Sequence, residues 1–113
     1  MPPSLEERGG RLSQLHRTFL SQLPALARGA LGAFEAAWTA DGGLHDDQEA
    51  LSRLHMLAGI LATFGHLKMF EDLRRLEYLL LQTEAPSTAE MLRGQRIAAS
   101  IRAQVEALTR QPV

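Results

Sequence analysis

Apolar residues recur along this chain every three or four positions, and this periodicity is the feature that most constrains the fold. Leu and Ala carry most of the pattern, β-branched residues are scarce, and no segment alternates apolar and polar residues as a strand does. Apolar residues make up 45% of the 113 residues and charged residues 22%, which excludes wholesale disorder. The sequence therefore predicts an all-α protein with one packed core.

Near the N-terminus, capping and breaker residues predict a short extra helix. A capping-box pattern begins at Ser4, and Gly9-Gly10 is expected to end the helix that it opens. Residues 1–10 are therefore interpreted as an N-terminal capping segment. Residues 11–113 are interpreted as a single helical bundle domain.

The rest of the chain is expected to form four principal helices with short connections. The first begins at Arg11 and contains Pro24, which either kinks it or starts another helix. Three more are expected over residues 46–64, 67–82 and 87–108, bounded by Asp46, Gly65 and Ser87. Short connections force neighbours to run antiparallel, so an up-down four-helix bundle is predicted. The apolar stripes are assigned to its core; their members include Leu12, Leu15, Phe19, Leu23, Leu54, Leu61, Leu67, Leu73, Leu76, Tyr78 and Ile101.

Charge and composition exclude several functional classes. Twelve Lys+Arg against thirteen Asp+Glu give a net charge of -1, so no electrostatic attraction to nucleic acid or an anionic membrane is expected. Without cysteine there is no disulfide, thiolate metal site or cysteine nucleophile. No apolar run approaches the roughly 20 residues of a membrane span, and the polar start does not suit a secretory signal. We expect a cytoplasmic protein.

The chemistry-bearing candidates are four histidines. His16, His45, His55 and His66 include no pair at i, i+3 or i, i+4, so no metal site is predicted. His45 lies in a turn region and His66 just after a helix stop, and both are expected to be surface residues. His16, beside an apolar neighbour, is expected to be partly buried.

His55 differs because helical geometry places it about 150° from the core face of its helix. It is therefore expected to be exposed in the middle of the helix, among small, weakly polar neighbours. Gly59 shares this face, although Gly inside a helix costs about 0.5–1 kcal/mol relative to Ala. We interpret Gly59 as giving another molecule access to His55. The expected docking surface around His55 comprises Gln48, Ser52, Met56, Ala58, Gly59, Ala62 and Thr63.

The sequence places no acid, base or pocket beside His55, and Glu77 is expected to have a structural role. Hydrolysis needs an activated nucleophile or water and an oxyanion site, so it does not fit. Neutral imidazole is a competent nucleophile near pH 7, because its unperturbed pKa is about 6.5. Phosphoryl transfer requires mainly that the acceptor atom is correctly positioned, and a partner protein can supply the metal ion and the cationic groups.

Two segments resemble the signature of histidine-containing phosphotransfer (HPt) domains. They are residues 55–65, HMLAGILATFG, and residues 73–77, LRRLE. The resemblance implies that Nε2 of His55 accepts a phosphoryl group from the aspartyl phosphate of a response-regulator receiver domain and passes it to another receiver aspartate. It also implies a hybrid histidine kinase as partner, no intrinsic kinase activity, no intrinsic cofactor, magnesium on the receiver, and a monomeric bundle.

One departure from the family pattern leaves alternatives open. The family usually has Lys three residues after the histidine, where this chain has Ala58, and neither Arg53 nor Lys68 is expected to replace it. A degenerate bundle that docks receivers as an adaptor, without phosphoryl chemistry, is the main alternative. The phosphoacceptor bundle of a histidine kinase fits less well, because Met56 stands where such kinases have an acid. A small metal-binding bundle lacks the carboxylate–histidine pairs that it needs.

Overall fold

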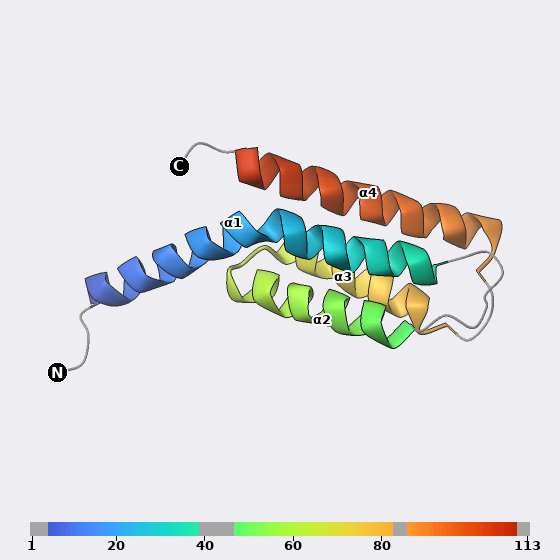
Figure 1. Cartoon of the computed structure of the whole chain (residues 1–113), viewed down its shortest axis with the longest axis horizontal. Coiled ribbons are helices and arrows are strands. Elements are labelled where there is room, and N and C mark those ends of the chain that lie inside the picture. The colour runs from blue at the N-terminus through green and yellow to red at the C-terminus, as the bar shows by residue number, and fades with distance from the viewer. Residues whose placement is uncertain (1–4, 39–46, 83–85, 111–113) are drawn as a thin grey trace.

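The computed structural model describes residues 5–38, 47–82 and 86–110, and these residues form helices without strands (Figure 1). The four helices are α1 (Leu5–Ala37), α2 (Asp47–Thr63), α3 (Leu67–Leu80) and α4 (Thr88–Arg110). The predicted all-α class is therefore confirmed.

The helices form an up-down bundle. Figure 1 shows each helix running antiparallel to the one before it. α1 packs against α2 and α4, and α3 also packs against α2 and α4, so that α1 and α3 lie diagonally across the bundle. This is the four-helix arrangement that short connections favour. It brings α2 and α3 side by side, which matters for His55.

Apolar side chains from all four helices fill the core, mostly Leu and Phe from α1, α2 and α3 and Ile101 and Val105 from α4. Because each helix repeats its apolar residues at three- and four-residue intervals, one face of each can be buried completely. Burying a side chain of this kind contributes about 1.5–3 kcal/mol. Its largest fully buried apolar members are Leu23, Leu31, Phe34, Leu54, Leu61, Leu73, Leu76 and Ile101.

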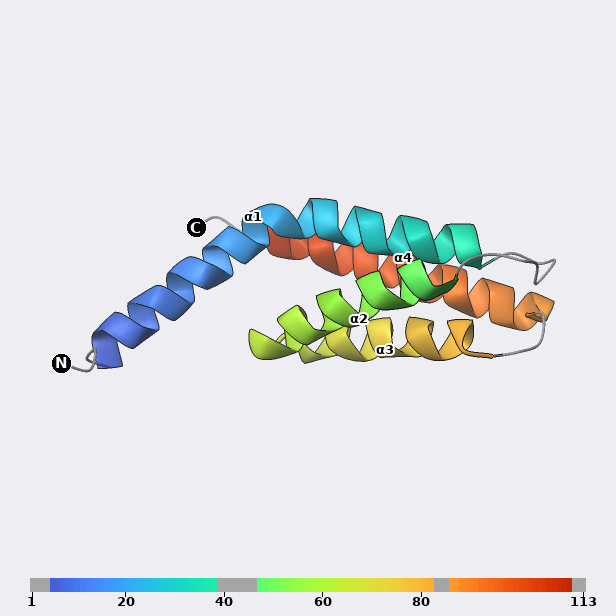
Figure 2. The same ribbon diagram turned by 60° about the horizontal axis from the view of Figure 1, so that its bottom comes forward.

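α1 is one helix, and the predicted break at Gly9-Gly10 is wrong. The helix runs without interruption from Leu5 to Ala37, so the described residues contain no separate N-terminal helix. Each glycine costs only about 1 kcal/mol inside a helix, which neighbouring helix formers can offset. Pro24 lies inside α1 and does not start a new helix. Figure 2 shows the axis of α1 changing direction part-way along, as expected where a proline ring removes one backbone hydrogen bond.

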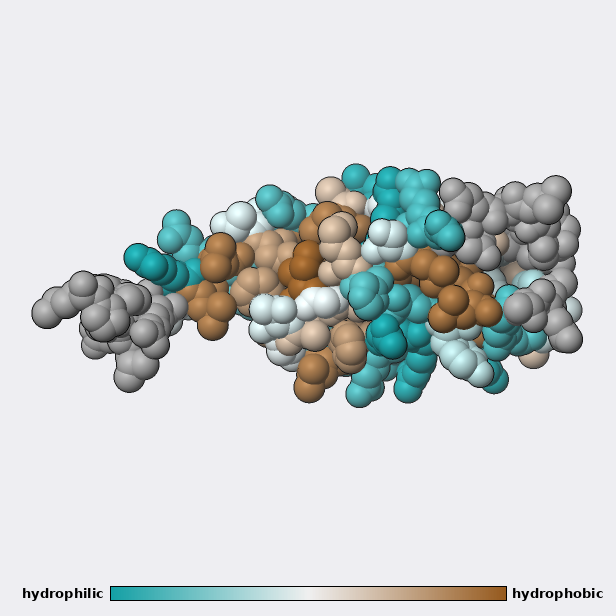
Figure 3. Space-filling view, turned by 90° about the horizontal axis from the view of Figure 1, so that it is seen from below, coloured by the Kyte–Doolittle hydropathy of each residue, from teal (hydrophilic) through white to brown (hydrophobic). Residues whose placement is uncertain are grey.

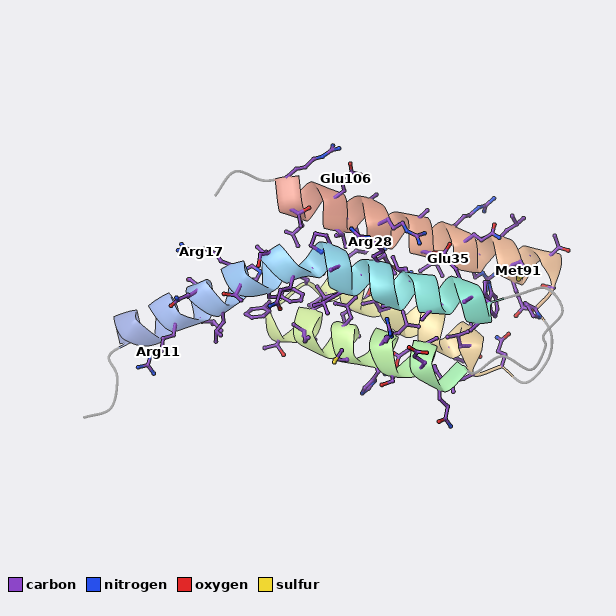
Figure 4. The ribbon with its side chains drawn as sticks, in the orientation of Figure 1. Arg11, Arg17, Arg28, Glu35, Met91 and Glu106 are labelled. Atoms are coloured by element: carbon purple, nitrogen blue, oxygen red, sulfur yellow. The ribbon has the colours of Figure 1, made fainter. Side chains whose placement is uncertain are left out.

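The N-terminal part of α1 projects beyond the other helices. α1 has 33 residues and α2 has 17, which correspond to about 50 and 26 Å. Leu12 and Leu15 are 54% and 60% exposed, and Figure 3 shows hydrophobic surface there. Figure 4 shows Arg11 and Arg17 on this part of α1, with no other helix beside them. The core assignment of Leu12 and Leu15 is wrong, because the neighbouring helices end before they reach them.

This projection also makes the molecule elongated. The radius of gyration is 16.3 Å, against about 13 Å for a compact domain of about 100 residues. The core assignment of Leu67 and Tyr78 on α3 is wrong as well, because they are 59% and 68% exposed. Leu67 is the first residue of α3, and Tyr78 lies about 200° around the helix from the buried Leu76. None of the described helices combines the length and the apolar character needed to cross a bilayer.

Two predicted helix boundaries are confirmed in atomic detail. Gly65 has a φ of 81°, and His66 N–H donates to the Leu61 carbonyl at 2.8 Å while Gly65 N–H donates to Ala62 at 3.0 Å. This pair of bonds is a Schellman motif, which ends α2. At the start of α4, Ser87 N–H donates to a Glu90 carboxylate oxygen at 3.1 Å, and Glu90 N–H donates to Ser87 Oγ at 3.2 Å. The capping predictions at Ser4 and Asp46, and the placement of His45, fall outside the described residues.

Candidate functional site

His55 lies on the outer face of α2. The helix buries Leu54, Leu57 and Leu61 to 2% exposure or less, whereas the His55 side chain is 73% exposed. Adjacent residues on a helix point about 100° apart, so a buried Leu54 directs its neighbour toward solvent. The predicted exposure of His55 is confirmed.

A carboxylate that sequence analysis did not place there meets the His55 ring. Nδ1 of His55 lies 3.2 Å from Oε1 of Glu77 on α3, and the Glu77 side chain is only 9% exposed. The other carboxylate oxygen, Oε2, accepts a hydrogen bond from Arg74 Nη1 at 3.3 Å. The expectation that no acid lies beside His55 is therefore wrong. Glu77 follows the core residue Leu76, and an acid at the edge of a core face was the signal available in the sequence.

This contact sets the chemistry of the imidazole. An ionised carboxylate can only accept hydrogen bonds, so the tautomer that satisfies this contact has its hydrogen on Nδ1, which donates a hydrogen bond to Glu77. The neutral ring then keeps its lone pair on Nε2. Arg74 holds the second oxygen and fixes the direction of the first. The chain Arg74–Glu77–His55 thus holds one ring nitrogen against a buried carboxylate and leaves Nε2 as the unprotonated nitrogen of a side chain that is 73% exposed.

Most of the predicted docking surface is accessible. Gln48, Ser52, Gly59 and Thr63 are exposed, Met56 is 55% exposed, and Ala62 is half-buried. A Cβ added at Gly59 would meet nothing within 4 Å, so helix packing does not require a glycine there. Thr63 Oγ1 donates to the Gly59 carbonyl at 2.9 Å. The small residues therefore leave the surface beside His55 low and open.

Ala58 is the exception, and its assignment to the docking surface is wrong. Its exposure is 1%, because it lies four residues after Leu54 and three before Leu61, on the same buried face of α2. A partner cannot contact it. A lysine at this position would also have to leave the core to reach His55.

The basic residues nearest in sequence do not contact His55. Arg53 Nη2 donates to Glu49 at 2.7 Å, along its own helix. Lys68 Nζ donates to Asp72 at 3.2 Å. The cation connected with His55 is instead Arg74, through Glu77.

A second buried carboxylate joins α3 to α4. The Asp72 side chain is 3% exposed and accepts hydrogen bonds from Lys68 at 3.2 Å and from Arg75 at 3.3 Å. It also accepts one from Gln104 Nε2 of α4 at 2.9 Å. Buried carboxylates need such partners, because each unpaired charge away from water is costly. Asp72 therefore fixes how α3 sits against α4.

Two other histidines meet where α1 passes the end of α2. Nε2 of His16 lies 2.8 Å from Nε2 of His66, and the His16 ring stacks on Phe64 at a centroid distance of 4.8 Å. Both histidines are half-buried, which confirms the prediction for His16 and contradicts that for His66. Burial, and secondly the neighbouring His16, lower the pKa of His66 below its ordinary value of 6.5. Within the described part of the chain, no three His, Asp or Glu side chains gather as a metal site requires.

Comparison with known proteins adds no relative. No protein family, curated protein or solved structure matches this chain. The geometry around His55 therefore has to support a function by itself.

Proposed function

We propose that this protein is a histidine phosphotransfer protein that relays a phosphoryl group between receiver-domain aspartates through His55, in the cytoplasm. The observation that carries the proposal is the His55–Glu77 contact. It combines an imidazole that is 73% exposed with a carboxylate that is 9% exposed, 3.2 Å apart. A solvated surface histidine needs no such partner, whereas a nucleophilic one benefits from a fixed tautomer.

The transfer step follows from the tautomer. The Nε2 lone pair of His55 forms the N–P bond, and the P–O bond of the donor aspartyl phosphate breaks. The leaving oxygen returns to the donor as a carboxylate. The imidazole keeps its proton on Nδ1 and gains positive charge as the N–P bond forms. Glu77 stabilises that charge at the atom where the proton sits. Return transfer to a second aspartate reverses each change.

The remaining charge compensation is assigned to the partner. No Lys follows His55 at the position that Ala58 occupies, and neither Arg53 nor Lys68 contacts the ring. Phosphoryl transfer relies on metal ions and cations around the phosphoryl oxygens, and in this proposal the receiver supplies them. The docking surface, with Ala58 removed from it, admits the receiver because Ser52, Gly59 and Ala62 beside His55 are small.

A phosphotransfer assay tests the proposal. A panel of receiver domains is phosphorylated with labelled phosphate, and each is mixed with the protein in the presence of magnesium. We expect label that is stable in alkali and labile in acid on the natural protein and on His66→Gln, and none on His55→Gln.

Two results would contradict the proposal. Label that persists in His55→Gln places the acceptor elsewhere. Receiver binding that survives without any label on the natural protein indicates the alternative function, a docking module that keeps the bundle without the chemistry.

A further inference from the structure

An open cleft of about 670 Å³ lies between α3 and α4, apart from the exposed ring of His55. Three arginines line it: Arg74 and Arg75 from α3, and Arg93 from α4. Apolar side chains of Leu79 and Ile97 form another part of its wall. None of the described residues that line it carries a carboxylate. The cleft thus combines three guanidinium groups with apolar surface.

Two of the arginines are held in place by carboxylates that do not line the cleft. Arg74 donates to Glu77 and Arg75 donates to Asp72, each at 3.3 Å. Each guanidinium has five N–H donors, so these bonds leave donors for a ligand. Their side chains are 54% and 61% exposed. Anchoring reduces the side-chain entropy that a ligand would otherwise have to overcome, so the arginines are partly preorganised for an anion.

The lining identifies the chemical class of the ligand. Guanidinium groups bind phosphate through paired N–H donors, with more geometric specificity than an ammonium group provides. Leu79, Ile97 and the ring of Tyr78, which is 68% exposed, offer contact to an organic group. The volume lies within the range of small-molecule pockets, which combine apolar walls with a few polar groups. We propose that this cleft binds a small organic phosphate, with its phosphate at the arginines and its organic part against the apolar wall.

Calorimetric titration of the full chain tests this site. The probes are adenosine monophosphate and glucose 6-phosphate, each compared with inorganic phosphate and with adenosine. We expect at least one organic phosphate to bind about tenfold more tightly than inorganic phosphate, and adenosine to bind more weakly than its phosphate.

Arginine variants assign the binding to the cleft. Arg93→Gln is expected to weaken organic phosphate binding by about tenfold. Arg96→Gln, one turn further along α4 and outside the cleft lining, is the matched control and should bind as the natural protein does. Circular dichroism verifies that both variants keep the helical fold.

Three results would overturn the proposal. They are the absence of saturable binding by both organic phosphates, affinity no greater than that of inorganic phosphate, and equal losses in Arg93→Gln and Arg96→Gln. His55→Gln should leave the titration unchanged, so failure here and failure of the phosphotransfer proposal are distinguishable.

Discussion

His55 and the His16–His66 pair show how the same side chain acquires different properties in two regions of one bundle. Each ring has a partner within 3.2 Å, but the partner of His55 is a carboxylate and the partner of His16 is another imidazole. His55 is 73% exposed, whereas His16 and His66 are half-buried. A carboxylate such as Glu77 stabilises positive charge on a neighbouring imidazole. A second imidazole does not, and His16 together with burial lowers the pKa of His66. The partner and the burial together therefore give these three histidines different surroundings, and only those of His55 match the proposed phosphoryl acceptor.

The largest expected effect comes from removing the carboxylate of the first region. Glu77→Ala should slow phosphotransfer by about 10- to 100-fold, because a charge-assisted hydrogen bond contributes about 1.5–3 kcal/mol. Glu77→Gln keeps a hydrogen-bond acceptor without the charge, so its phosphotransfer rate should lie between those of Glu77→Ala and the natural protein. Single-turnover transfer from a phosphorylated receiver measures the rate. Glu71→Gln, exposed on the same helix, is the control; if it matched Glu77→Ala, the contact with His55 would not be the cause.

The turn that positions His66 should matter for stability and not for transfer. Gly65→Ala is expected to lower the free energy of unfolding by about 1–2 kcal/mol, since φ is 81° and a Cβ is unfavourable in the left-handed region. Urea denaturation measures the loss. Folded Gly65→Ala protein should transfer phosphate at nearly the natural rate. A large loss of transfer would show that the two regions are not independent.

Acid should destabilise the protein through the histidine pair. The pKa of His66 is lowered in the folded state, so the unfolded chain binds the proton more tightly. The contribution of His66 to stability is therefore complete above its ordinary pKa and is lost as the pH falls through the lowered value. Burial of the His66 ring is the main cause of this loss, and the neighbouring His16 is the second.

Urea denaturation at pH 7.5 and at pH 5 measures this dependence, because the two values lie on either side of the ordinary histidine pKa of about 6.5. His66→Gln should reduce the difference in unfolding free energy between the two pH values, and His55→Gln should retain it. An unchanged difference in His66→Gln would assign the acid sensitivity to other groups.

The smallest expected effect separates stability from docking. Gly59→Ala should raise the free energy of unfolding by about 0.5–1 kcal/mol, because Ala is the better helix former and its Cβ meets nothing within 4 Å. It should also weaken receiver binding, measured by calorimetry. Gly32→Ala on α1 is the matched control, since a Cβ there is equally unobstructed. Equal receiver affinity in both variants would remove Gly59 from the docking surface.

Most features that depend on one helix were predictable from the sequence, although the break expected at Gly9-Gly10 was not found. The periodicity of apolar residues gave the helical class and the exposure of His55, and local turn chemistry gave the end of α2 at Gly65 and the cap at Ser87. The error at Ala58 was also local: its spacing from Leu54 and Leu61 already placed it on the buried face.

Features that depend on the fit between helices were not predictable. Glu77 lies 22 residues from His55 in the sequence, and His66 lies 50 from His16. Whether such residues meet depends on how far each helix is rotated and shifted against its neighbour, which periodicity does not specify. Leu12 and Leu15 repeat like core residues and are exposed only because the other helices stop short of them.

Asp72 has a mechanical consequence for the rest of α3. It bonds to Gln104 of α4, and Glu77, five residues later, bonds to His55 of α2. Five residues correspond to about 140° around a helix axis. α3 is thus held by hydrogen bonds on two faces, and a rotation of the helix about its axis would distort both of them. The orientation in which Glu77 meets the His55 imidazole therefore depends on the Asp72–Gln104 contact on the other side of α3.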